Sequence, residues 1–195
     1  CGGVMQTIKQ FLAEGRDAPL YHGVREVRAI APIVNNMELH PYTFQLARSL
    51  LKAPLLPIGE FERGEPTHRA RLGISLTRSL RFAKNWSKSR DGVVFVLELD
   101  QAKLAQRYEL IPLSFFKTWR KNPELAEAEE FLLTTQPIKV EPYLKRIWVS
   151  SFTIQYLEMR ANIDGYLDWQ VAANVLKKHP LVKTFSGKAY SSRYI

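Results

Sequence analysis

Apolar residues recur at two spacings along this chain, and each spacing predicts one type of element. Short apolar or alternating runs predict strands over 20–22, 74–77, 93–99, 131–135 and 143–153. Apolar residues three and four positions apart predict helices over 4–14, 24–34, 43–52, 79–88 and 171–178. The segment 104–113 fits both patterns, whereas 54–72 is rich in Pro, Gly and charge, as expected of a long loop. Because strands and helices are mixed without a regular βαβ order, we expect an α+β fold, as a single domain over 1–195.

Two of the predicted strands carry polar residues in or beside an apolar run. One ends in Tyr21-His22-Gly23, where the His can offer a ring nitrogen and the Gly lets a ligand approach the backbone closely. The other alternates, so that Ser75 and Thr77 lie on the same face. Taken singly, such a His is more often structural, and such hydroxyls often belong to an exposed edge strand.

A third polar group precedes a later strand. The acidic run 127–130 leads directly into the apolar run 131–133. Because side chains alternate along a strand, Glu130 shares a face with Leu132 and Glu129 lies on the other face. At least one of these carboxylates therefore points toward the covered side, where it needs a hydroxyl or a cation as partner. A solvated acidic helix end before a core strand is the alternative.

The charge adds a class of partner. The net charge is +9, from 28 Lys and Arg against 19 Asp and Glu, which favours polyanions such as nucleic acid because binding releases condensed counterions. The positive residues are dispersed, with clusters at 63–81 and 117–121 and no long basic tail. A basic globular protein without a polyanionic partner is the alternative.

The composition also restricts the compartment. Cys1 is the only cysteine, which excludes an internal disulfide and a cysteine-based metal cluster and indicates a reducing compartment. No run approaches the roughly 18 apolar residues of a membrane span. No cationic region followed by an apolar one marks a signal peptide. We therefore expect a cytoplasmic protein with no membrane partner.

In this order, the His, Ser/Thr and Glu motifs resemble those of the ADP-ribosyltransferase superfamily, whose strands carry a His or Arg, then a Ser/Thr or Tyr element, then a Glu. The helix expected over 79–88 and the segment 137–147 are also similar, so the resemblance covers about residues 18–150. The family implies split mixed and antiparallel β-sheets flanked by helices. It also implies a glycosyltransferase that uses NAD+ as co-substrate and needs no metal.

The resemblance assigns the catalytic role to a glutamate. In this family NAD+ is cleaved between nicotinamide and ribose, and a glutamate holds the ribose 2′-hydroxyl and stabilises the developing positive charge. By resemblance Glu130 has that role and takes a proton from the acceptor, with Glu129 as the alternative. Trp86 would supply the aromatic ring that relatives place near the nicotinamide, unless it is a core residue of its helix.

The remaining motif residues are assigned to NAD+ by the same resemblance. His22, next to Tyr21, would bond the adenosine ribose, and Gly23 would give the dinucleotide close access to the backbone. Ser75 would bond and orient the glutamate or the nicotinamide ribose, with Thr77 in support.

The acceptor depends on which glutamate is catalytic. If it is Glu129, Glu127 completes the Glu-x-Glu pattern of protein-modifying relatives. If it is Glu130, Ala128 stands two positions before it, and an Ala so placed before Glu-Phe-Leu resembles toxins that modify nucleic acid bases. The second motif also lacks the tyrosine of some relatives. The basic charge favours a nucleic acid acceptor, RNA or DNA, over a protein.

Other functions remain compatible with the same residues. An NAD+ glycohydrolase would use water as acceptor, and a non-catalytic nucleic-acid-binding domain would keep the fold without the activity. A toxin, defence or phage setting would add an antitoxin or inhibitor as a partner. Three further rings suit either base stacking or ordinary packing: Tyr42, Phe116 and Trp119.

Overall fold

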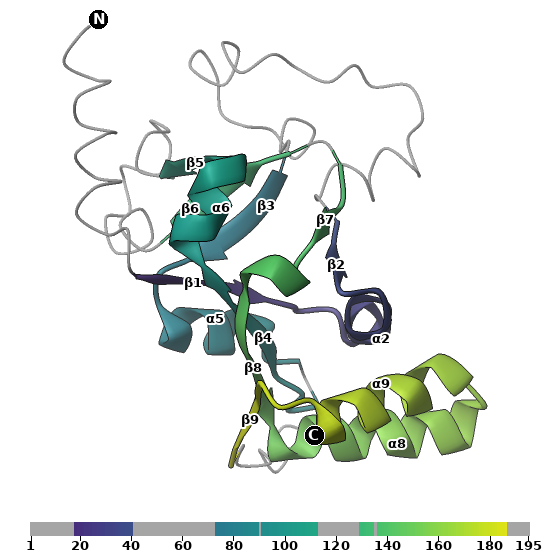
Figure 1. Ribbon diagram of the computed structural model, residues 1–195. Coiled ribbons are helices and arrows are strands. Elements are labelled where there is room, and N and C mark those ends of the chain that lie inside the picture. The colour runs from purple at the N-terminus through teal and green to yellow at the C-terminus, as the bar shows by residue number, and fades with distance from the viewer. Residues whose placement is uncertain (1–17, 41–72, 90, 113–128, 135, 187–195) are drawn as a thin grey trace, which may run out of the picture.

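The computed structural model describes residues 18–40, 73–89, 91–112, 129–134 and 136–186, and they form an α+β fold (Figure 1). The main sheet has seven strands in the order β5-β6-β3-β1-β4-β8-β9. Its strands are β1 (Pro19–Gly23), β3 (Gly73–Thr77), β4 (Phe95–Asp100), β5 (Glu109–Pro112), β6 (Glu129–Leu133), β8 (Leu144–Ser150) and β9 (Val182–Phe185). Neighbouring strands are antiparallel except β8 and β9, so the sheet is mixed.

Five described helices surround this sheet. They are α2 (Val27–Asn36), α5 (Leu80–Ser87), α6 (Gln101–Arg107), α8 (Ser151–Asp164) and α9 (Leu167–Lys178). A short 3₁₀ helix, η3 (Glu141–Tyr143), precedes β8, and a separate two-stranded sheet pairs β2 (Glu38–Leu39) with β7 (Ile138–Lys139). No helix in the described ranges is long and apolar enough to span a membrane.

The two faces of the main sheet differ in what covers them. One face carries the main hydrophobic core, in which Leu20, Leu97 and Ile147 pack against apolar residues of α2, α8 and α9. The opposite face carries α5, whose Ala83 packs on Val96 in a smaller cluster. Figure 1 shows α5 on the other side of β4 and β8 from α2, α8 and α9.

The sheet is nearly divided between β1 and β3. Strand β1 pairs with β4 along its whole length, from Pro19 opposite Asp100 to Gly23 opposite Val96. On its other side the only registered pair with β3 is Tyr21 with Thr77. The residues of β1 after Tyr21 have no registered partner in β3, and they lie at a junction between two halves of the sheet.

Several sequence expectations are confirmed and one is wrong. The expected strands over 20–22, 74–77 and 93–99 are β1, β3 and β4, and the helices expected over 24–34 and 79–88 are α2 and α5, with ends shifted by a few residues. The ambiguous segment 104–113 contains the end of α6 and then β5. The expectations for 4–14, 43–52 and 54–72, and those for the rings of Tyr42, Phe116 and Trp119, lie outside the described residues.

The strand expected over 143–153 ends at Ser150, because α8 begins at Ser151. The Thr153 hydroxyl accepts a hydrogen bond from the Val94 N–H (3.1 Å) and donates one to the Val94 carbonyl (2.8 Å). The Ser150 hydroxyl lies 2.8 Å from that of Thr153. These bonds fasten the first turn of the helix to the segment before β4, which a strand over the same residues would not do.

Candidate functional site at the junction of strands β1 and β3

His22 and Ser75, from the first two sequence motifs, meet where β1 and β3 separate. The His22 Nδ1 lies 2.9 Å from the Ser75 carbonyl oxygen. Because a carbonyl only accepts hydrogen bonds, Nδ1 carries the proton and donates it. Burial lowers the pKa of His22, against the smaller opposite effect of the bond to Ser75. The ring is therefore neutral at pH 7, and its Nε2 is an acceptor.

The second ring nitrogen of His22, Nε2, lies on the side of the ring away from the Nδ1 contact with Ser75. In the described part of the chain, His22 Nε2 has no hydrogen-bond partner, and the His22 side chain is half-buried. An acceptor nitrogen in this position accepts a hydrogen bond from a hydroxyl group. The junction therefore has a hydrogen-bonding group suited to a sugar.

The strand register separates the two candidate glutamates. Glu130 pairs with Leu76, and Glu129 pairs with Thr77. Residues directly opposite each other in an antiparallel pair lie on the same face of the sheet. Leu76 belongs to the main core, so Glu130 occupies the core face and Glu129 the face that carries α5.

His22 also lies on the core face. His22 pairs with Leu97, which is fully buried in the main core. Position 130 therefore shares a face with His22, whereas position 129 shares a face with Ser75 and Thr77. The one-residue choice between the glutamates is thus a choice between two sides of the sheet.

The hydroxyls of the second motif have different surroundings. Ser75 is exposed, and its carbonyl holds the His22 ring. Thr77 is buried, and its Oγ1 accepts a hydrogen bond from the Ser79 N–H (3.2 Å). The Ser79 hydroxyl in turn accepts a bond from the Phe82 N–H and caps α5. Thr77 thus supports the start of α5 rather than the junction itself.

Gly23 is required by the packing of α5 on β1. A Cβ at this position would lie 2.6 Å from the Ala83 carbonyl oxygen and 3.2 Å from the Ser87 Cβ. The oxygen belongs to the helix backbone and cannot move aside alone, so any side chain here would push α5 away. The glycine thereby sets how close α5 lies to the junction.

Trp86 lies on the surface of α5 and is not a core residue. Its side chain is 54% exposed. The guanidinium carbon of Arg25, two residues after Gly23, lies 5.4 Å from the centre of the indole ring, a cation–π contact. The ring is therefore held near the end of β1 with one surface open to a ligand.

Tyr21 faces the α5 side of the sheet, where it lies beside a carboxylate that the sequence analysis did not select. Glu98 pairs with Tyr21 in register and is buried. Its Oε2 accepts a hydrogen bond from the Trp148 indole N–H (2.7 Å) and lies 3.9 Å from Arg146. Burial raises the pKa of Tyr21, and the charge of Glu98 raises it further.

Glu98 was detectable from the sequence. It lies within the apolar run 93–99, and a polar residue in such a run is the same signal that selected Glu130. In the structure its Oε2 contacts Trp148 and Arg146, both on β8, so the carboxylate links β4 to β8.

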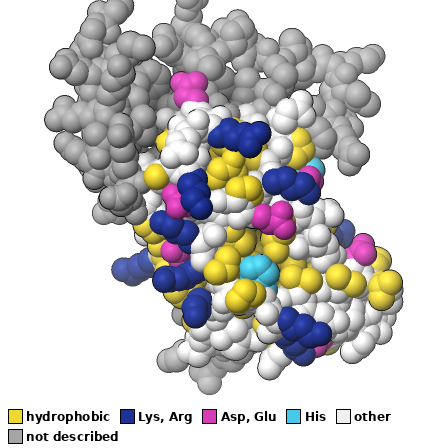
Figure 2. All heavy atoms as spheres, viewed as in Figure 1, with side chains coloured by type: hydrophobic (Ala, Val, Ile, Leu, Met, Phe, Trp, Pro, Cys, Tyr) yellow, Lys and Arg dark blue, Asp and Glu magenta, His cyan; other side chains and the backbone are white. Residues whose placement is uncertain are grey.

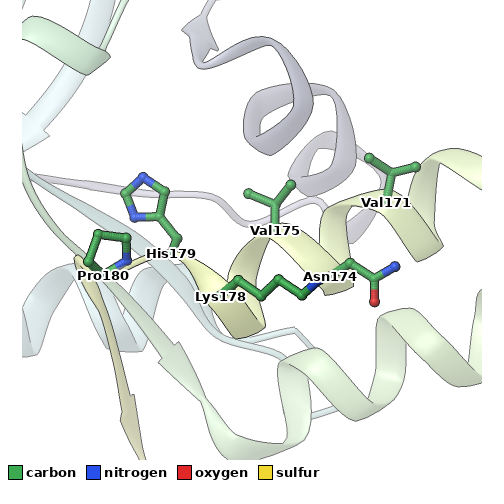
Figure 3. A pocket seen from close by; sticks show the side chains of 6 residues that line it. All are labelled: Val171, Asn174, Val175, Lys178, His179 and Pro180. Carbon is green, nitrogen blue, oxygen red and sulfur yellow. The ribbon is translucent and has the colours of Figure 1, made fainter.

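A separate hollow of ≈ 520 Å³ lies along α9 (Figure 3). The side chains around it come from the second half of α9 and the turn that follows: Val171, Asn174, Val175, Lys178, His179 and Pro180. The Nδ1 of His179 accepts a hydrogen bond from the Leu181 N–H (3.3 Å), which keeps the turn closed. No sequence-predicted site residue lines this hollow.

Comparison with protein-family models, with curated proteins and with solved structures gives no significant match. Over the described residues, no group of three or more His, Cys, Asp or Glu side chains is arranged to hold a metal ion. The functional interpretation therefore rests on the junction and the residues around it.

Proposed function

We propose that the protein is an NAD+-dependent ADP-ribosyltransferase that releases nicotinamide and transfers ADP-ribose to a macromolecule, with nucleic acid favoured over protein as the acceptor. The observation that carries the proposal is the neutral His22 at the junction, with an acceptor Nε2 and with Glu130 on the same face of the sheet. The resemblance of the three motifs supplies the reaction, and the net charge of +9 supports a polyanionic acceptor.

In the proposed mechanism each residue acts on a different part of NAD+. His22 Nε2 accepts a hydrogen bond from a hydroxyl of the adenosine ribose. Glu130 accepts one from the 2′-hydroxyl of the nicotinamide ribose and stabilises the positive charge that develops as the bond to nicotinamide breaks. The acceptor atom then bonds to the same ribose carbon, and its proton passes to Glu130. Ser75 fixes the His22 ring through its carbonyl, and Trp86 offers an open ring face near the end of β1.

The test is to incubate the protein with NAD+ labelled in the adenylate part, together with RNA, DNA and cell lysate. We expect the nucleic acid fraction to take up label and nicotinamide to be released in equal amount. Label in the protein fraction would show that the acceptor is a protein rather than a nucleic acid. Free ADP-ribose with no labelled polymer would identify an NAD+ glycohydrolase instead.

A non-catalytic nucleic-acid-binding domain on the same fold is the second candidate, because the positive charge alone supports it. It predicts no release of nicotinamide under any condition, together with tight binding of nucleic acid that weakens as salt rises.

A further inference from the structure

On the α5 side of the sheet, positive charge gathers where α5, β8 and β9 lie, beside the carboxylate of Glu98 on β4. Strands β3, β8 and β9 and helix α5 contain no Asp or Glu at all. The same elements and the end of β1 contribute Arg25, Arg81, Lys84, Arg146 and Lys183. In Figure 2, Lys and Arg side chains gather on the left side of the molecule, the side on which Figure 1 shows α5, with Asp and Glu side chains among them.

These cations are arranged around aromatic rings. The Lys84 Nζ lies 4.7 Å from the centre of the Trp148 ring and 4.0 Å from that of Phe185. The guanidinium of Arg146 lies 5.8 Å from the same Trp148 ring. Lys183 pairs in register with Trp148, so it lies on this face beside them. Positive charges and rings therefore alternate across β8, β9 and α5.

Within the part of the chain that the structure describes, most of these cations have no anionic partner. Four of the five take part in no ion pair among the described residues: Arg25, Arg81, Lys84 and Lys183. The fifth, Arg146, lies 3.9 Å from the carboxylate of Glu98. Burial lowers the pKa of Lys84, so an anion beside it would be stabilising. The surface therefore suits a ligand that brings its own negative charges.

We propose that this surface, formed by Arg25, Arg81, Lys84, Trp86, Arg146 and Lys183, binds single-stranded nucleic acid and presents it as the acceptor. Phosphates would contact the cations, and an unpaired base would stack on Trp86, whose ring is 54% exposed. An acidic peptide would satisfy the cations but not the rings. Trp86 connects this surface with the junction through Arg25, which follows β1. The role of this surface as the acceptor site rests on the proposed function, whereas its binding of single-stranded nucleic acid does not.

The test measures binding of a short fluorescent single-stranded RNA or DNA by anisotropy at several salt concentrations. Charge reversals Arg81→Glu and Lys183→Glu should each weaken binding about tenfold and reduce the salt dependence by about 0.7 in slope for each lost phosphate contact. Trp86→Ala should weaken binding by roughly 5- to 100-fold through lost stacking. Two matched controls lie outside this surface. Lys178→Glu makes the same change of charge at an exposed position of α9. Tyr166→Ala removes a ring that is 57% exposed, about as much as that of Trp86.

The surface is refuted if Arg81→Glu and Lys183→Glu bind like Lys178→Glu, or if an acidic peptide competes as well as the single strand. Release of nicotinamide from NAD+ without polymer is measured in parallel and should be unchanged in both reversals. If the wild-type protein binds the single strand through these residues but releases no nicotinamide, the proposed enzyme activity is refuted and the proposed binding surface is retained. If both charge-reversal variants label the polymer normally, the proposed binding surface is refuted and the enzyme activity is retained.

Discussion

At the scale of single residues, the proton on His22 Nδ1 decides what the junction can bind. With Nδ1 donating to Ser75, a neutral ring accepts at Nε2, whereas a protonated ring donates there. A ribose hydroxyl can form a hydrogen bond with either form of the ring. It donates its proton to Nε2 of the neutral ring, whereas it accepts a proton from Nε2 of the protonated ring. Burial keeps the ring neutral at pH 7 by lowering its pKa.

This lowered pKa makes stability depend on pH. The unfolded chain binds a proton at His22 near the ordinary value of 6.5, whereas the folded chain binds it only at lower pH. The stabilisation is therefore complete above about pH 6.5 and is lost as pH falls from there through the folded pKa. Between pH 7.5 and pH 5.5, the free energy of unfolding measured with urea should fall less in His22→Gln than in wild type. Equal losses in both proteins would contradict the burial of a neutral ring.

Also at the residue scale, Thr153 satisfies both backbone groups of Val94. Thr153→Val keeps the side-chain shape and leaves the Val94 N–H and carbonyl without this partner. We expect a loss of about 1–3 kcal/mol in the free energy of unfolding, measured with urea. Ser151→Ala, at an exposed position of the same helix, should change it by less than about 0.5 kcal/mol.

At the scale of elements, the position of α5 depends on Gly23. The Cβ of an alanine there would meet the Ala83 carbonyl, so α5 must move outward and carry Trp86 with it. Gly23→Ala should therefore destabilise the protein by about 1–3 kcal/mol. It should also shift the NMR signal of the Trp86 indole N–H.

Gly165→Ala is the matched control, because its cost comes from a φ of +69° and not from a contact. It should destabilise the protein but leave the Trp86 signal in place. An unchanged Trp86 signal in Gly23→Ala would show that α5 does not rest on this glycine.

The elements also show how far the sequence pattern could be followed. Strands β1, β3 and β4 were predictable because each is a local run with its own alternation or burial. The start of α8 was not, because Ser151 to Thr153 continue an apolar run and become helical through bonds to Val94, more than 50 residues away. The sequence also missed that Gly23 serves helix packing, since the contact with Ala83 is not local.

For the candidate site, the sequence selected residues but not their surroundings. The motifs gave His22 and Ser75 separate roles, whereas in the structure the two are in contact through the Ser75 carbonyl rather than its hydroxyl. Alternation along the strand already puts the two glutamates on opposite faces. Only the pairing of β6 with β3 shows which of them is on the core face and which is on the α5 face.

At the scale of the whole molecule, the near-division of the sheet and the uneven charge have complementary roles. Separation of β1 from β3 beyond one registered pair creates the junction where NAD+ is proposed to bind. The α5 side, with cations on rings, lies next to it through Arg25 and Trp86. The donor site on the core face and the acceptor surface on the α5 face would thus meet at the end of β1.

The account depends most directly on the assignment of Glu130. Release of nicotinamide from NAD+ should be compared for Glu130→Gln and Glu129→Gln, with equal unfolding midpoints as the check that both variants fold. We expect Glu130→Gln to lose roughly 10²- to 10³-fold in rate, because a charge that stabilises the transition state is removed, and Glu129→Gln to stay within a few-fold of wild type. Full activity in Glu130→Gln with loss in Glu129→Gln would contradict the account and move the site to the α5 face of the sheet.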